Sequence, residues 1–215
     1  MPKTPSLALA QDTEADKLLS EDPLALLIGM VLDQQIPLEW AFKGPLMLKD
    51  RLGMSLDASH IAAMDPEELK AAFSTRPALH RFPGSMANRV QELCQAIVDD
   101  YAGEPAKVWK SARTGEQLYA NVKGLPGFGE QKARIFVALL AKQFGVQPAG
   151  WQDKAGEYGA AGSYKSVADI IDAESLGKVR EYKSAMKKAA KAKAGPEGQP
   201  KGKADKAEKA AKSKA

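Results

Sequence analysis

The chain is poor in the residues from which metal centres and disulfide frameworks are built. It has one cysteine, Cys94, and two histidines, His60 and His80, among 215 residues. One cysteine excludes a disulfide framework, and it also excludes the four thiolates of a zinc site or an iron–sulfur cluster. We therefore expect no cofactor, no metal site and no iron–sulfur cluster.

Long apolar runs are also missing. The longest run extends from Leu24 to Leu32, whereas a membrane-spanning helix needs about 20 apolar residues. The N-terminal stretch MPKTPSLALA is too short for the apolar core of a secretory signal. The expectation is a cytoplasmic protein, a monomer without a membrane partner.

The net charge of +4 is divided unevenly along the chain. Residues 183–215 contain 11 lysines and three acidic residues, a net charge of +8, which leaves −4 for residues 1–182. We therefore expect a folded body, 1–182, and a Lys/Ala-rich tail, 183–215, that is disordered or partly helical. The tail is either a solubilising extension or an arm that binds nucleic acid by neutralising phosphates.

Helix signals dominate the body. Asp22-Pro23 and Asp65-Pro66 each combine an N-cap residue with a proline at the first helical position. Apolar residues recur at helical spacing from Ser85 to Tyr101, and Cys94 lies among them, which favours a buried thiol. No convincing period-two alternation occurs, so we predict an all-α fold of about ten helices.

Residues 125–133 carry the most informative motif, LPGFGEQKA. A helix that begins after Thr114 leads into a glycine turn, and a second helix continues to about residue 143. Gly127, Phe128 and Gly129 let the backbone turn sharply, and the amides that open the second helix suit a phosphate. An ordinary pair of helices joined by a glycine turn would have the same local pattern.

The full string closely resembles the hairpin of the HhH-GPD (helix-hairpin-helix) DNA glycosylase superfamily, which includes endonuclease III and the methyladenine glycosylases. DPLALLIGMVLDQQIPLEWA resembles the early buried helix of that superfamily, which ends in a glutamine pair near the lesion pocket. The resemblance covers roughly residues 20–155 and is strongest to cluster-free, actinobacterial-type base-excision repair proteins. It implies a two-lobed helical fold and double-stranded DNA as the partner.

The resemblance assigns roles to the hairpin residues one by one. Gly127, Phe128 and Gly129 match the turn whose backbone amides hold a DNA phosphate. Family members with lyase activity have a lysine at the seventh position of the string, and Gln131 occupies that position here. Lys132 follows and points about 100° away on a helix, so we expect it to meet phosphate or solvent. The resemblance therefore implies a monofunctional glycosylase without the lyase lysine.

Other site residues follow from the same resemblance. Asp153 is the candidate catalytic carboxylate, and the alternative is a solvated acid at a helix start. Asp169 is a more distant candidate, which would more readily cap a helix or lie on the exposed face of one. Gln34 and Gln35 would fill or line the space that a flipped base leaves, or else cap a helix and make buried hydrogen bonds. His80 and Arg81 could contact phosphate or simply be exposed.

Three functions remain open from the sequence. The first is a monofunctional DNA glycosylase of base-excision repair, which removes a damaged base after flipping it from the duplex and is nucleoid-associated when bound to DNA. The second is a catalytically inactive DNA-binding protein on the same scaffold. The third is a helical protein that binds another partner and matches the hairpin by chance.

Overall fold

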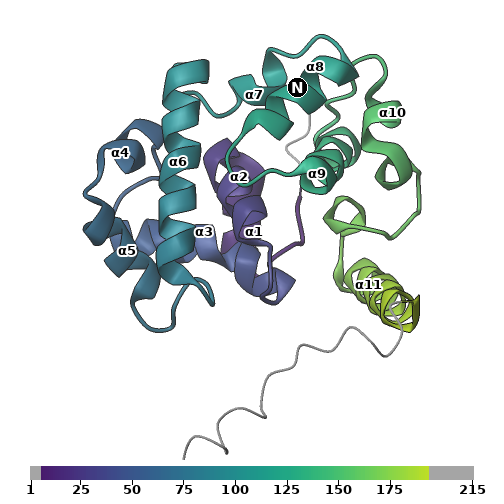
Figure 1. Cartoon of the computed structure of the whole chain (residues 1–215), viewed down its shortest axis with the longest axis horizontal. Coiled ribbons are helices and arrows are strands. Elements are labelled where there is room, and N and C mark those ends of the chain that lie inside the picture. The colour runs from purple at the N-terminus through teal and green to yellow at the C-terminus, as the bar shows by residue number, and fades with distance from the viewer. Residues whose placement is uncertain (1–5, 194–215) are drawn as a thin grey trace, which may run out of the picture. The chain divides into compact units, whose positions relative to one another are not determined.

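Helices form almost everywhere that the sequence predicts them. The computed structural model describes residues 6–193 and contains eleven α-helices, two 3-10 helices and no strand in that range (Figure 1). The α-helices are α1 (Thr13–Glu21), α2 (Pro23–Leu32), α3 (Leu38–Leu52), α4 (Ala58–Ala63), α5 (Pro66–Ser74), α6 (Pro83–Tyr101), α7 (Lys107–Lys110), α8 (Gly115–Gly124), α9 (Glu130–Gln143), α10 (Trp151–Ala155) and α11 (Ala173–Lys193). The 3-10 helices are η1 (Gly156–Gly159) and η2 (Val167–Asp169). The all-α prediction is confirmed.

The expected caps explain where several helices begin and end. The carboxylate of Asp22 accepts the amides of Leu24 and Ala25 and so starts α2. Asp65 starts α5 in the same way, and Gly53 ends α3 with a φ of +66°. These contacts satisfy backbone groups that a helix leaves without partners at its ends.

Helix α2 lies at the centre of the first group of helices. All of its residues from Leu24 to Leu32 are buried, and it packs against α1, α3 and α6. Helices α4 and α5 cover the other side of α6, as Figure 1 shows. We call α1–α6 the N-terminal lobe.

Helix α9 organises a second group. It packs against α8, α10, η1 and η2, and the short α7 connects this group to α6. We call α8–α10 with η1 and η2 the hairpin lobe. The hairpin predicted at 114–143 is present as α8 and α9.

The thiol of Cys94 belongs to the core of the N-terminal lobe. Its side chain is fully buried on α6, and burial raises the pKa of the thiol to about 12. A thiol with that pKa is not a nucleophile at neutral pH, because the thiolate is the reactive form. The expectation of a buried, inert cysteine is confirmed.

The C-terminal part of the chain divides within α11. The two compact units are Met1–Arg180 and Glu181–Ala215. Our boundary after residue 182 stays a prediction. Of the predicted tail, 183–215, residues 183–193 are helical as part of α11, and residues 194–215 lie outside the described range. No helix of residues 6–193 is both long and apolar enough to cross a bilayer.

Candidate nucleic-acid interface

The turn between α8 and α9 is built on two glycines with different roles. Gly127 has a φ of +87°, which L-residues with side chains rarely adopt. Gly129 is extended, with φ −79° and ψ 175°, and the space beside it is open. Between them, Phe128 is buried and meets Phe136 edge to face at 5.6 Å between ring centroids. The side chain of Phe128 thus anchors the turn in the core.

Backbone amides at the start of α9 have no acceptor within residues 6–193. The amides concerned belong to Gly127, Gly129, Glu130, Gln131 and Lys132, and no side chain caps the helix there. Such amides, together with the positive end of the helix dipole, attract an anion. The hairpin therefore has the donors that the sequence predicted for a phosphate.

Lys132 faces the protein and not the phosphate or solvent that we expected. Its amine donates hydrogen bonds to the carbonyl oxygens of Met30 at 2.5 Å and Val31 at 3.2 Å, at the end of α2. Burial lowers the pKa of this amine to about 8; Asp33 opposes that shift and Arg89 adds to it. The lysine thus joins the hairpin lobe to the N-terminal lobe.

The predicted glutamine pair divides into one structural and one exposed residue. The side-chain amide of Gln34 donates to the carbonyl of Val31 at 2.7 Å, so it caps α2, as the alternative for this residue foresaw. Gln35 is exposed and adopts a φ of +58°. Of the two glutamines, Gln35 is the more accessible to a partner.

His80 joins the Gln34–Gln35 loop to the start of α6. It is buried, contrary to the expectation of surface exposure. The amide of Phe82 donates to its Nδ1 at 3.0 Å, so its Nε2 carries the proton and donates to the carbonyl of Gln34 at 2.8 Å. Phe82 itself is 45% exposed, with Arg81 over its ring at 5.4 Å. No local pattern around residue 82 predicts an exposed phenylalanine.

Gln131, at the seventh position of the hairpin string, borders a small hollow. Its amide donates to the hydroxyl of Tyr158 at 2.9 Å. The hollow has a volume of about 340 Å³ and is lined by Glu130, Gln131, Arg134, Ala155, Glu157 and Tyr158. Sequence reasoning did not single out Tyr158 or Glu157, because their approach to Gln131 depends on how η1 packs against α9.

Asp153 lies in the first turn of α10 and is exposed. The loop before it is held against the start of α8, where the Gly115 amide donates to Ala149 at 2.7 Å. A methyl group on Gly115 would lie 2.4 Å from the backbone of Gly150 and Trp151, so only glycine permits this approach. In the described part of the chain, the Asp153 carboxylate makes no hydrogen bond or ion pair and is not among the groups lining the hollow.

Asp169, the more distant candidate, is occupied by structural contacts. It is buried, accepts the amine of Lys142 at 2.6 Å and the hydroxyl of Ser163 at 3.0 Å, and closes a capping box with Ser166. These contacts fix the segment after η1 to α9. Of the two alternatives for this residue, the capping role is confirmed and the position on an exposed helix face is wrong.

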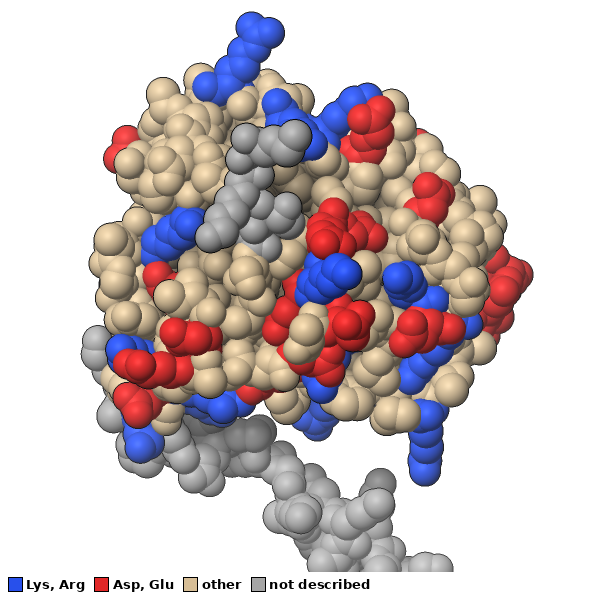
Figure 2. All heavy atoms as spheres, turned by 180° about the vertical axis from the view of Figure 1, so that it is seen from behind, with Lys and Arg blue, Asp and Glu red and all other residues tan. Residues whose placement is uncertain are grey.

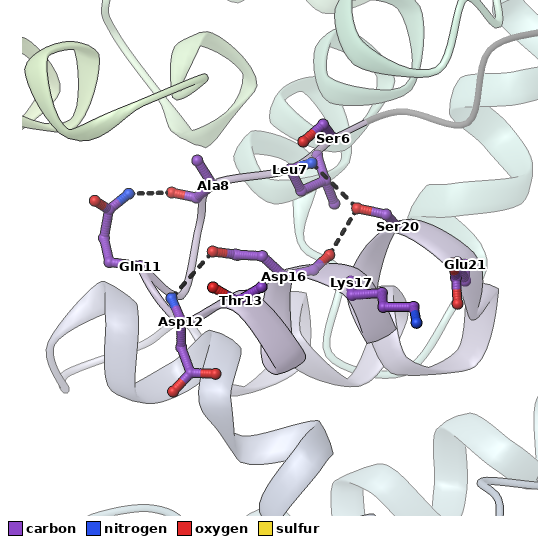
Figure 3. Close-up of a pocket in the computed structure, with 10 residues that line it drawn as sticks. All are labelled: Ser6, Leu7, Ala8, Gln11, Asp12, Thr13, Asp16, Lys17, Ser20 and Glu21. Atoms are coloured by element: carbon purple, nitrogen blue, oxygen red, sulfur yellow. Dashed lines mark hydrogen bonds between the residues drawn. The ribbon is translucent and has the colours of Figure 1, made fainter.

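A second hollow, of about 580 Å³, lies where the N-terminal segment crosses α1 (Figure 3). The buried carboxylate of Asp16 accepts the amides of Ala10 at 2.7 Å and Asp12 at 3.2 Å, and Ser20 accepts the amide of Leu7. Burial raises the pKa of Asp16. These polar groups hold the N-terminal segment, and their hydrogen bonds are made within the protein.

Among residues 6–193, no three His, Cys or acidic side chains lie close enough together to form a metal site.

Acidic and basic side chains alternate over the rear face of the molecule. Figure 2 shows Lys and Arg next to Asp and Glu there, without a continuous basic area. The net charge of residues 1–182 is −4. Attraction to phosphate in the body therefore depends on local groups such as the hairpin.

The fold and the hairpin define a helix-hairpin-helix DNA-repair protein. The family model described as HhH-GPD superfamily base excision DNA repair protein matches residues 28–195. The chain therefore belongs to this superfamily, and its family indicates a role in base-excision repair of DNA. No curated protein and no solved structure matches the chain significantly.

Proposed function

We propose that this protein is a monofunctional DNA glycosylase, which flips a damaged base from the duplex and hydrolyses its bond to the sugar. The observation that carries the proposal is the row of acceptor-free amides at the start of α9, beside a turn whose second glycine faces open space. Amides in that arrangement hold a phosphate close to the backbone. This fixes the duplex against the hairpin without reading its sequence.

The absence of lyase chemistry follows from the residue at the seventh hairpin position. The amide of Gln131 is not a nucleophile and cannot form a Schiff base with the sugar. The neighbouring amine of Lys132 is directed to the carbonyls of Met30 and Val31. Water is therefore the group that replaces the base, and the strand is left intact at an abasic site.

Base extrusion needs groups that take the place of the base in the stack. Gln35 and Phe82 are both exposed, and His80 ties their two loops together. An apolar ring that enters between base steps unstacks and bends the duplex. We assign Phe82 to that wedge and Gln35 to the vacated space.

A carboxylate is required to complete the reaction. Asp153 is the proposed group: it would accept a proton from the attacking water, or stabilise the positive charge on the sugar while the base leaves with its electron pair. Its carboxylate has no internal partner in residues 6–193, so it is available for either role.

Base release is the decisive test. Duplexes with alkylated, deaminated or oxidised bases are incubated with the full chain, and abasic sites are scored. We expect product with at least one lesion and loss of product in Asp153→Asn, with DNA affinity unchanged. The matched variant is Glu157→Gln, which removes a carboxylate that lines the hollow beside Gln131. Unchanged activity of Asp153→Asn would clear Asp153 of the role.

The alternative is a DNA-binding protein without glycosylase activity. It is favoured by the position of Asp153, which is not part of the hollow next to Gln131. This alternative predicts binding without base release for every lesion. Removal of residues 183–215 tests whether the lysine-rich tail contributes to affinity, and equal affinity of the shortened chain would discard that contribution.

A further inference from the structure

Arg89 of α6 lies directly against the hairpin turn. A methyl group in place of the Gly127 hydrogen would be 3.1 Å from Cδ of Arg89 and 3.1 Å from Cγ2 of Val31. The aliphatic part of Arg89 therefore packs on the turn itself. Because the guanidinium group is bonded to Cδ, it must also lie close to the turn.

The charge of Arg89 is not matched by an acid. Its side chain is half-buried, and within residues 6–193 it makes no hydrogen bond or ion pair. Two cations of the neighbouring hairpin lobe, by contrast, have acidic partners: Arg134 pairs with Glu130 at 2.8 Å, and Lys142 pairs with Asp169 at 2.6 Å. Arg89 thus differs from them in having no ion pair within residues 6–193.

A second cation lies near Arg89. Lys132 is close enough for the two positive charges to repel each other, while Asp33 attracts the lysine. Two cations at one place with a single acid leave an excess of positive charge beside the free amides of α9. Such an arrangement costs free energy in the isolated protein and is compensated when an anion binds.

We infer that Arg89 and the hairpin amides hold the same DNA phosphate, so that α6 supplies the net charge that the amides lack. The inference rests on the proposed function and deepens it. Backbone amides donate hydrogen bonds but carry no net charge, whereas a guanidinium fork can donate two parallel bonds to phosphate oxygens. The phosphate would then bridge the two lobes.

The salt dependence of DNA binding tests this contact. Arg89→Met keeps an unbranched side chain against Gly127 and removes the charge. We expect affinity for an undamaged duplex to fall about tenfold at low salt, and the slope of log K against log salt to decrease by about one, because one phosphate is no longer neutralised. The control is Lys107→Met, since Lys107 already pairs with Glu104 at 2.8 Å. The control should bind with the slope of the wild type.

The possible outcomes separate the two proposals. If the wild-type chain does not bind duplex DNA even at low salt, the proposed function is overturned. If it binds and Arg89→Met has the same affinity and slope, only the inference about Arg89 is overturned. Should the methionine variant fail to fold by circular dichroism, Arg89→Lys takes its place. It keeps the charge and the slope but loses the fork, so unchanged affinity would contradict the inference.

Discussion

The amine of Lys132 lies 2.5 Å from the carbonyl oxygen of Met30, across the junction of the two lobes. The last carbonyls of a helix have no partner within the helix and carry partial negative charge, which favours a cation beside them. A residue of the hairpin motif thereby caps the central helix of the other lobe. The hairpin motif therefore contains the residue that attaches the hairpin to the N-terminal lobe.

The Lys132 amine should make stability depend on alkaline pH. Its pKa is about 8 in the folded chain and 10.5 when unfolded. Below pH 8 both states hold the proton and the contribution is constant. Between pH 8 and 10.5 the unfolded chain binds more protons, so the free energy of unfolding should rise by about 2–3 kcal/mol.

Denaturant unfolding at pH 7, 8.5 and 10 measures this effect, with Lys132→Met as the variant. The rise should be absent from the variant, and the difference between the two proteins isolates the contribution of Lys132. Lys107→Met is the control and should retain the rise, because Lys107 is half-exposed and ion-paired. A rise of equal size in Lys132→Met would show that the amine is not buried in solution.

The two glycines of the turn should respond differently to alanine. Gly127→Ala places a methyl group at a φ of +87° and 3.1 Å from Arg89 and Val31, so we expect a loss of about 1–3 kcal/mol of stability. Gly129→Ala meets no atom within 4 Å and should fold normally.

DNA affinity distinguishes the roles of these glycines. Because the methyl group of Gly129→Ala would stand where a phosphate approaches the backbone, this variant should bind duplex DNA at least several-fold more weakly, with an unchanged melting temperature. Both quantities are measured on the same preparation. Wild-type affinity in Gly129→Ala would contradict phosphate binding at the turn.

The buried His80 and the exposed Phe82 should differ in their effect on stability. His80→Leu leaves the amide of Phe82 and the carbonyl of Gln34 without their partner, at a cost of about 1–3 kcal/mol. Phe82→Ala removes an exposed ring and should change stability by less than about 0.5 kcal/mol.

Phe82→Ala should nevertheless weaken base opening if Phe82 is the wedge. Fluorescence of 2-aminopurine placed in the duplex measures base opening. Equal fluorescence would assign the ring no part in extrusion.

Asp169 should matter for stability and not for chemistry. Asp169→Asn leaves the amine of Lys142 without its carboxylate in a buried place, so we expect a loss of about 3 kcal/mol. Thermal unfolding measures the loss, and base release at a temperature where the variant is folded should persist. Complete loss of activity in the folded variant would reopen Asp169 as a catalytic candidate.

Local signals predicted the helices well because caps act over a few residues. Asp22, Asp65 and Gly53 each contact backbone groups within four positions of themselves. The directions of Lys132 and His80 could not be predicted in the same way. Lys132 meets Met30, 102 positions away, and His80 meets Gln34, 46 positions away. Such contacts depend on how the lobes pack, which a single sequence does not display.

Helix α6 sets the distance between two of the proposed DNA contacts, Phe82 and Arg89. Phe82 immediately precedes it, and Arg89 lies seven residues further along the same rigid rod. At 1.5 Å per residue this separation is about 10 Å. For comparison, base pairs are stacked about 3.4 Å apart, so a helix that ran along the duplex would span roughly three base pairs between these two residues. Insertion of one residue between them would lengthen this separation by only about 1.5 Å but would rotate Arg89 by about 100° relative to Phe82, without changing either side chain.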